Sequence, residues 1–199
     1  IPFNASATIV TPSVIAAGQS GLQIVMNNGT LWQVIGSDAI PRGVSPAIGA
    51  DSSGRPLTIS APRTMVSTPN GEYILLLAGN GYVYLYDALT DEFVTGRQIF
   101  TRTTTGTSPV NTTQGLYGAV AAGPRGQYFL ANGLILNQSL TPIGAVPTVA
   151  GPTARGGQQQ LLSPPVAALA AVGTTTFARL TQPIRLTANA PLTDTPSVE

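Results

Sequence analysis

The residues of this chain that could do chemistry are eight carboxylates and nine arginines, because the sequence contains no His, Cys or Lys. Their absence excludes Ser-His-Asp and Cys-His nucleophilic sites, zinc sites of the usual His/Cys type and Schiff-base chemistry. Two carboxylates that face each other across a cleft could still hydrolyse a glycosidic bond. The acidic residues are Asp38, Asp51, Glu72, Asp87, Asp91, Glu92, Asp194 and Glu199.

Several of these acidic residues fall at expected turns, where a structural role is the more frequent one. An Asp such as Asp87 accepts hydrogen bonds from its own backbone in a turn, and a turn Glu such as Glu72 is solvated. Asp51 opens an Asp-Ser-Ser-Gly turn that could offer oxygens to Ca²⁺, but the further acidic ligands of a calcium loop are missing. We therefore predict no catalytic residue, no metal site and no cofactor.

Seven charged residues around the clearest repeat are nevertheless candidates for a ligand-binding or interface surface. They are Asp38, Arg42, Asp51, Arg55, Arg63, Asp91 and Arg97. Arg and Asp side chains in loops also pair with each other or with water, and such exposed pairs contribute little to stability. Propeller ligands collect at the central channel, so convergence of Asp38, Asp51 and Asp91 there would favour a ligand site. Scattering of these residues on the rim would favour a scaffold.

The elements that must position these side chains follow a repeat, of which residues 63–94 are the clearest copy. Hairpin and turn signals separate four expected strands, Met65–Ser67, Tyr73–Ala78, Tyr82–Asp87 and Glu92–Thr95. Tyr82, Tyr84 and Tyr86 lie on one side of the third strand, where they could stack on a sugar or, more commonly, pack against a neighbouring sheet. Four antiparallel strands in succession make one blade of a β-propeller.

Weaker copies of this blade precede and follow it. Gly21, Gly71 and Gly126 occupy the same expected turn position, 50 and 55 residues apart, a spacing typical of propeller blades. We predict an all-β fold, a β-propeller or partial propeller of about four blades, as a single repeat array over residues 1–199. The blades are expected near residues 14–60, 63–100, 116–145 and 166–190. A β-sandwich is the alternative, because it also has short strands and regular turns.

The segment Pro69-Asn-Gly-Glu-Tyr-Ile-Leu-Leu-Leu-Ala-Gly-Asn-Gly-Tyr-Val-Tyr-Leu-Tyr-Asp87 resembles the blades of bacterial extracytoplasmic β-propellers of the YVTN or Kelch-like type. The resemblance covers residues 14 to about 190 unevenly, and only the central blade matches well. It implies a scaffold fold and brings no common catalytic residue to this chain.

Composition narrows the partners and the location. Charged residues are 9% of the chain and the net charge is +1 without a basic run, which does not favour nucleic acid as a partner. The longest apolar runs are too short for a membrane-spanning helix. Low charge, abundant Thr and Asn and the missing Lys favour a bacterial protein that is secreted, periplasmic or on the cell surface.

An array of four blades is short, because the propellers that this repeat resembles generally have more. Open sheet edges invite pairing with another chain, and residues 193–199 look like the approach to another strand. We therefore expect a non-enzymatic scaffold or interaction module, completed by another chain or by copies of itself. The alternatives are a carbohydrate-binding or hydrolytic propeller whose site lies partly on other blades, and a β-sandwich adhesin. Residues 101–113 and 150–159 are expected to be exposed loops.

Overall fold

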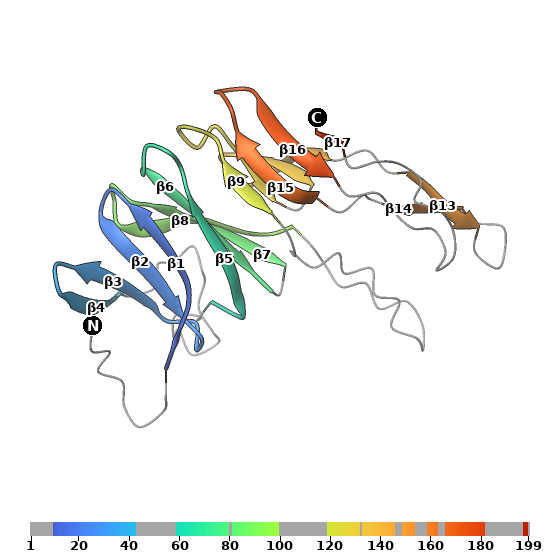
Figure 1. Cartoon of the computed structure of the whole chain (residues 1–199). Helices are drawn as coiled ribbons and strands as arrows, with labels where there is room; N and C mark the ends of the chain where they lie inside the picture. Colours follow the sequence, from blue (N-terminus) through green and yellow to red (C-terminus); the bar gives the residue numbers. More distant parts are fainter. Residues whose placement is uncertain are drawn as a thin grey trace, which may run out of the picture.

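The computed structural model describes residues 10–42, 59–79, 81–99, 119–131, 133–145, 149–153, 159–162, 166–181 and 197–198. Every regular element in these ranges is a β-strand. The strands form three four-stranded sheets, one three-stranded sheet and one two-stranded hairpin, all antiparallel and with strands paired in chain order (Figure 1).

The first sheet consists of β1 (Pro12–Gly18), β2 (Gly21–Met26), β3 (Leu31–Ile35) and β4 (Asp38–Arg42). The second consists of β5 (Pro62–Ser67), β6 (Tyr73–Ala78), β7 (Tyr82–Asp87) and β8 (Glu92–Gln98). The third consists of β9 (Val120–Ala122), β10 (Tyr128–Ala131), β11 (Leu134–Asn137) and β12 (Pro142–Ala145). The fourth consists of β15 (Val166–Ala171), β16 (Phe177–Thr181) and β17 (Ser197–Val198). The separate two-stranded hairpin consists of β13 (Val149–Thr153) and β14 (Gln159–Leu162).

The second and third sheets are built around the same turn. Gly71 and Gly126 both have positive φ, 72° and 70°, which a residue with a side chain rarely adopts. Each glycine donates its backbone N–H to the carbonyl three residues earlier, to Thr68 at 2.8 Å and to Gly123 at 3.1 Å. Pro and Gly have the same spacing around Gly71 and Gly126 because each of these sheets has a tight turn between its first two strands.

The sheets pack face to face in series, and β6 shows this most clearly. Its alternate residues face two different neighbours, which is why a strand of six apolar or aromatic residues is buried on both sides. Ile74 and Leu76 join a core with Val25 and Leu31 of the first sheet. Leu75 and Leu77 join a second core with Phe129, Ala131 and Leu136 of the third sheet.

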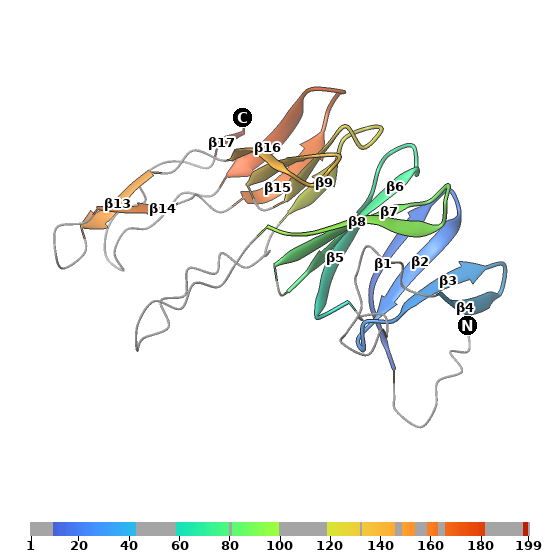
Figure 2. The same ribbon diagram turned by 180° about the vertical axis from the view of Figure 1, so that it is seen from behind.

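The first strand of each sheet lies at the inside of the array. β1 contacts β5, β5 contacts β9 and β9 contacts β15, so these four strands follow one another along the inner side (Figure 2). Successive sheets around an inner row of strands are the arrangement of a β-propeller, here with four sheets in the described residues. The predicted fold class is confirmed, and the two-layer packing of a β-sandwich is not what the sheets form.

The tyrosine stripe of β7 is used for packing between sheets. Tyr82 and Tyr84 stack with ring centroids 5.8 Å apart, and Phe93 meets Tyr84 and Tyr86 edge-on at 6.0 and 5.3 Å. Tyr84 and Tyr86 are buried in the core shared with the first sheet. The rings therefore present no open stripe on which a sugar could stack.

One feature differs from the prediction. Residues 150–159, expected as a loop, include parts of β13 and β14, because the backbone pairs as a hairpin in spite of its Gly and Pro. In the fourth sheet, β16 begins at Phe177, after a turn in which Val172 and Gly173 donate their backbone N–H groups to the carbonyl of Thr176. The inner strand β15 is buried on one face only. The predicted loop 101–113 lies outside the described residues.

Candidate functional site

The structure describes five of the seven predicted site residues, and they are spread over two sheets. Asp38 begins β4 and Arg42 ends it, on the outside of the first sheet. In the second sheet, Arg63 lies on the inner strand β5, and Asp91 precedes the outer strand β8 that contains Arg97. Asp51 and Arg55 lie outside the described residues. The described acidic candidates therefore lie toward the rim.

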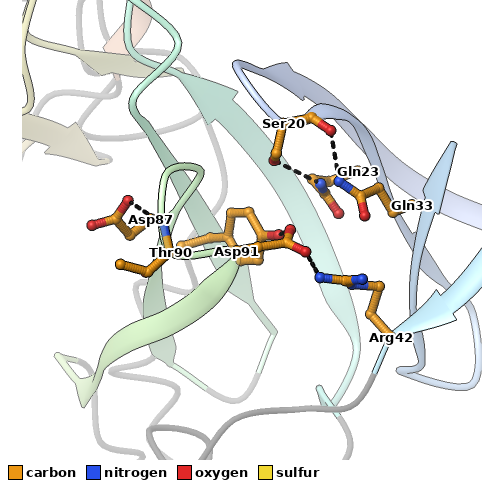
Figure 3. A network of polar contacts seen from close by, with 8 residues as sticks. Ser20, Gln23, Gln33, Arg42, Asp87, Thr90 and Asp91 are labelled. Atoms are coloured by element: carbon orange, nitrogen blue, oxygen red, sulfur yellow. Dashed lines mark hydrogen bonds and ion pairs between the residues drawn. The ribbon is translucent and has the colours of Figure 1, made fainter. Parts of the chain in front are cut away.

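Two of the predicted residues come together between sheets. Arg42 forms an ion pair with Asp91, whose carboxylate also accepts a hydrogen bond from the hydroxyl of Tyr86. Figure 3 shows Arg42 reaching from the first sheet to Asp91 in the turn of the second. Asp91 has φ of 60°, a conformation that Asp tolerates better than most residues because its short side chain bonds locally. The pair is partly exposed, so it acts as a link between sheets more than as a buried charge.

Asp87 has the structural role predicted for it. Its Oδ1 accepts the backbone N–H groups of Leu89 at 2.8 Å and Thr90 at 3.3 Å. The equivalent turn of the third sheet uses Asn137 in the same way, accepting from the N–H groups of Ser139 at 3.0 Å and Thr141 at 2.9 Å. The carboxylate of Asp87 therefore caps the turn that follows it in the sequence.

A buried polar cluster beside the ion pair was missed by sequence reasoning. Gln23 and Gln33 are paired across β2 and β3 and are both buried. The side-chain amide of Gln33 donates to the carbonyl of Ser20 at 2.6 Å, and that of Gln23 donates to the hydroxyl of Ser20 at 3.3 Å (Figure 3). The Oε1 atom of Gln23 has no hydrogen-bond partner among the described residues. The sequence signal that could have revealed this cluster is the pair of glutamines in an otherwise apolar hairpin.

Burial raises the pKa of Tyr86 above its usual value of 10.0, and hydrogen bonding to Ser20 and the charge of Arg42 oppose this only partly. Burial is also the main cause of the raised pKa of Tyr84 and of Tyr128. A tyrosine with a raised pKa stays protonated near neutral pH and acts as a hydrogen-bond donor. The neutral hydroxyls of Tyr86 and Tyr128 serve as donors, that of Tyr86 to Asp91 and that of Tyr128 to the turn of the fourth sheet.

Polar contacts also join the later sheets. Arg97 of β8 donates to the hydroxyl of Thr141, just before β12. The hydroxyl of Tyr128 reaches the turn of the fourth sheet, at 2.9 Å from the carbonyl oxygen of Gly173 and 2.7 Å from that of Thr176. Each neighbouring pair of sheets is thus linked by at least one side chain as well as by an apolar core.

The described residues offer little space for a small ligand. A shallow, open hollow lies between the third and fourth sheets, lined mainly by apolar side chains such as Leu134 and Leu169, with Arg179 also in its lining. Its cavity volume of about 10 Å³ is roughly what a single water molecule needs. In the described part of the chain, no three acidic residues gather where they could hold a metal ion, and no helix has the length and apolar character needed to cross a membrane.

Comparison with known proteins supports the fold. The chain is similar to the structure of U3-55K, with 13% sequence identity, a TM-score of 0.51, and coverage of 88% of this chain and 46% of that one. A crystal structure of RRP9 WD40 repeats is matched at 12% identity and a TM-score of 0.48, over 88% of this chain and 46% of that one. The chain thus spans about half the length of the structures it matches. No protein-family model and no curated protein matches the sequence.

Proposed function

We propose that this chain is a non-enzymatic β-propeller module whose function is to bind another protein. The proposal rests on one observation: charged side chains of the described residues connect neighbouring sheets. Arg42 and Asp91 link the first two sheets, and Arg97 links the second to the third. The two described acidic candidates, Asp38 and Asp91, belong to the outer parts of two different sheets.

Exposed apolar side chains supply the surface that such a module needs. Ile15 is 55% exposed, Ile143 63% and Val172 70%. Single exposed aliphatic residues are ordinary, but Ile15 and Val172 belong to the first and last sheets of the array, where a propeller would have further neighbours. Protein contact at these sheets is therefore favoured over binding of a small ligand.

We also propose that the protein belongs to the bacterial extracytoplasmic propellers that its central blade resembles. Low charge, abundant Thr and Asn and the absence of Lys support a secreted, periplasmic or surface location. Fractionation of bacterial cells that express the protein from its natural gene, with a C-terminal tag added, tests this. The tag is expected outside the cytoplasm, and a wholly cytoplasmic tag would contradict the location.

The interaction function is tested by crosslinking the tagged protein in its native cells and identifying what is joined to it by mass spectrometry. We expect a stoichiometric protein partner, either another chain or a second copy. A matched experiment offers the purified protein to a glycan array and to polysaccharide substrates. Binding or cleavage that is lost in both Asp38→Asn and Asp91→Asn, in the absence of any crosslinked protein, would favour the carbohydrate-active alternative.

A further inference from the structure

The turn between β5 and β6 contains the dipeptide Asn70-Gly71, and Asn-Gly pairs recur in the sequence at Asn28, Asn80 and Asn132. An Asn side chain before glycine is open to attack by the next backbone nitrogen, because glycine has no side chain that hinders the approach. Asn28 and Asn70 lie within the described residues, whereas Asn80 and Asn132 lie outside them. The two described pairs are held in place by different contacts.

Hydrogen bonds within its own turn hold the Asn70-Gly71 pair. Gly71 donates its backbone N–H to the carbonyl oxygen of Thr68 at 2.8 Å. The Oδ1 atom of Asn70 accepts the backbone N–H of Glu72 at 3.2 Å. The Gly71 nitrogen must lose its proton before it can attack the Asn70 side chain, and in the closed turn that proton is bound by Thr68. The closed turn therefore protects Asn70.

Gln19, in the turn between β1 and β2 of the first sheet, holds the same pair from outside. Its backbone N–H donates to the carbonyl oxygen of Gly71 at 2.8 Å, and its Nε2 donates to the carbonyl oxygen of Asn70 at 3.0 Å. A Cβ atom on Gly71 would lie 3.2 Å from the backbone nitrogen of Gln19, so the two turns are in close contact. Opening of the Asn70 turn therefore requires the loss of a contact between the first and second sheets.

We propose that Asn70 is a modification site, at which the side-chain amide is converted to aspartate or isoaspartate when the contact with Gln19 opens. The backbone nitrogen of Gly71 loses its proton to solvent and attacks Cγ of Asn70, and the new N–C bond closes a five-membered succinimide ring. The Cγ–Nδ2 bond breaks, and the amide group leaves as ammonia with a proton from solvent. Water then opens the ring at one of its two carbonyl carbons, which gives aspartate or isoaspartate. Only water is consumed, so the reaction needs no enzyme, metal or cofactor.

The modification marks chains in which this contact between the first and second sheets has opened. Either product adds a negative charge two residues from Glu72, and like charges repel. Isoaspartate also lengthens the backbone of the turn by one carbon atom. The carbonyl groups at positions 70 and 71 then no longer match the two donors of Gln19, so the modified chain closes the contact less well. The inference does not depend on the proposed interaction function.

Asn28 serves as an internal reference, because its pair is held without Gln19. Its Oδ1 atom accepts the backbone N–H of Thr30 at 3.1 Å and the hydroxyl of Thr30 at 2.7 Å. The carbonyl oxygen of Gly29 accepts the backbone N–H of Ile59 at 3.1 Å. The rate of modification at Asn28 should therefore not depend on Gln19.

The experiment incubates the full chain at neutral pH and follows each Asn-Gly site by peptide mapping and mass spectrometry. A synthetic peptide of residues 65–75 gives the rate for an open turn. Asn70 is expected to react at least about 10-fold more slowly in the folded chain than in the peptide, because only the opened fraction of the chain reacts.

Removal of the Gln19 side chain tests the control by the first sheet. Gln19→Ala removes one hydrogen bond to the Asn70 carbonyl and is expected to raise the rate at Asn70 about two- to tenfold, with the rate at Asn28 unchanged. The matched control is Gln138→Ala, at an exposed glutamine between β11 and β12 of the third sheet, which should change neither rate. Circular dichroism would verify that both variants are folded.

Three results would overturn the proposal. Equal rates at Asn70 in the folded chain and in the peptide would show that the turn gives no protection. A rate at Asn70 that Gln19→Ala leaves unchanged, or raises together with the rate at Asn28, would show that the contact with Gln19 does not control the site. Chains modified at position 70 can be separated by their added charge, and the backbone amide of Gln19 should exchange its hydrogen faster in them. Unchanged exchange would contradict the loosening of the contact.

Discussion

The guanidinium of Arg42, at the end of the last strand of the first sheet, pairs with the carboxylate of Asp91, in a turn of the second sheet. The two residues are 49 positions apart in the sequence, about one blade repeat. The pair links the outer parts of the two sheets, and the apolar core between these sheets extends from Val14 of β1 to Phe93 of β8. Because both side chains are partly exposed, their contribution to stability should be modest and sensitive to salt.

A double-mutant cycle with Arg42→Gln and Asp91→Asn measures this contribution. We expect a coupling free energy of about 0.5–1 kcal/mol at low ionic strength, decreasing in high salt. Asn is chosen because it tolerates the positive φ of residue 91. Urea unfolding of the four proteins supplies the values. A coupling that does not change with salt would show that the two residues interact through packing instead of charge.

Replacing two glycines by alanine separates backbone strain from steric contact. Gly36 has φ of 63° and open space where a Cβ would stand, so Gly36→Ala should cost only the strain, roughly 1–2 kcal/mol. At Gly29, with φ of 80°, a Cβ would lie 2.3 Å from the carbonyl oxygen of Ile59. Gly29→Ala should therefore cost more, at least about 3 kcal/mol, because backbone must move. Equal losses in thermal unfolding would contradict the close approach of Ile59.

The two buried glutamines should respond differently to replacement by methionine, which has a similar volume. Gln33→Met removes the donor to the Ser20 carbonyl and is expected to cost about 1–2 kcal/mol. Gln23→Met removes a buried oxygen that lacks a partner among the described residues and only a long hydrogen bond. Its stability should stay the same or increase by up to about 1 kcal/mol. Chemical denaturation of both variants tests the difference, and a larger loss for Gln23→Met would mean that its oxygen is satisfied.

Stability should fall in alkaline solution. Burial raises the pKa of Tyr84, Tyr86 and Tyr128 in the folded state, so the unfolded chain binds fewer protons once the pH exceeds the ordinary tyrosine value of 10.0. The stabilisation is fully present below that pH and is lost as the pH rises toward the folded pKa values. Unfolding midpoints should decrease above about pH 10. Tyrosinate absorbance that appears only on unfolding checks the assignment, and the triple Phe variant should show a weaker decrease.

Much of the fold could be predicted from local patterns. Strands β6 and β7 have the bounds predicted for them, because an apolar run and an alternating run are each bounded by a turn that requires glycine. The ends of edge strands could not be predicted. β5 begins three residues earlier and β8 ends three residues later than expected, because pairing with a neighbouring strand extends them through polar residues. The local sequence of β5 and β8 does not indicate how far this pairing extends.

The polar contacts were predictable only in part. Asp87 caps a turn that its own sequence specifies, so its role could be inferred. The partner of Arg97, Thr141, is 44 residues away, and the Gln23–Gln33 pair depends on the register of two strands. Such contacts follow from the packing of sheets, which a single sequence does not display. As ligand or interface residues, all seven predicted site residues stay predictions, and Asp51 and Arg55 lie outside the described residues.

The two-sided burial of β6 makes the second sheet the shared wall of two cores. Opening that sheet must expose both cores at once, whereas the fourth sheet can separate with the loss of a single contact to the third. In a linear array each sheet is stabilised mainly by its nearest neighbours, so a sheet packed on both sides should open less readily than a sheet packed on one side. Amide hydrogen exchange should accordingly be slowest in β6 and fastest in β16, so that the chain loosens from its last sheet inward.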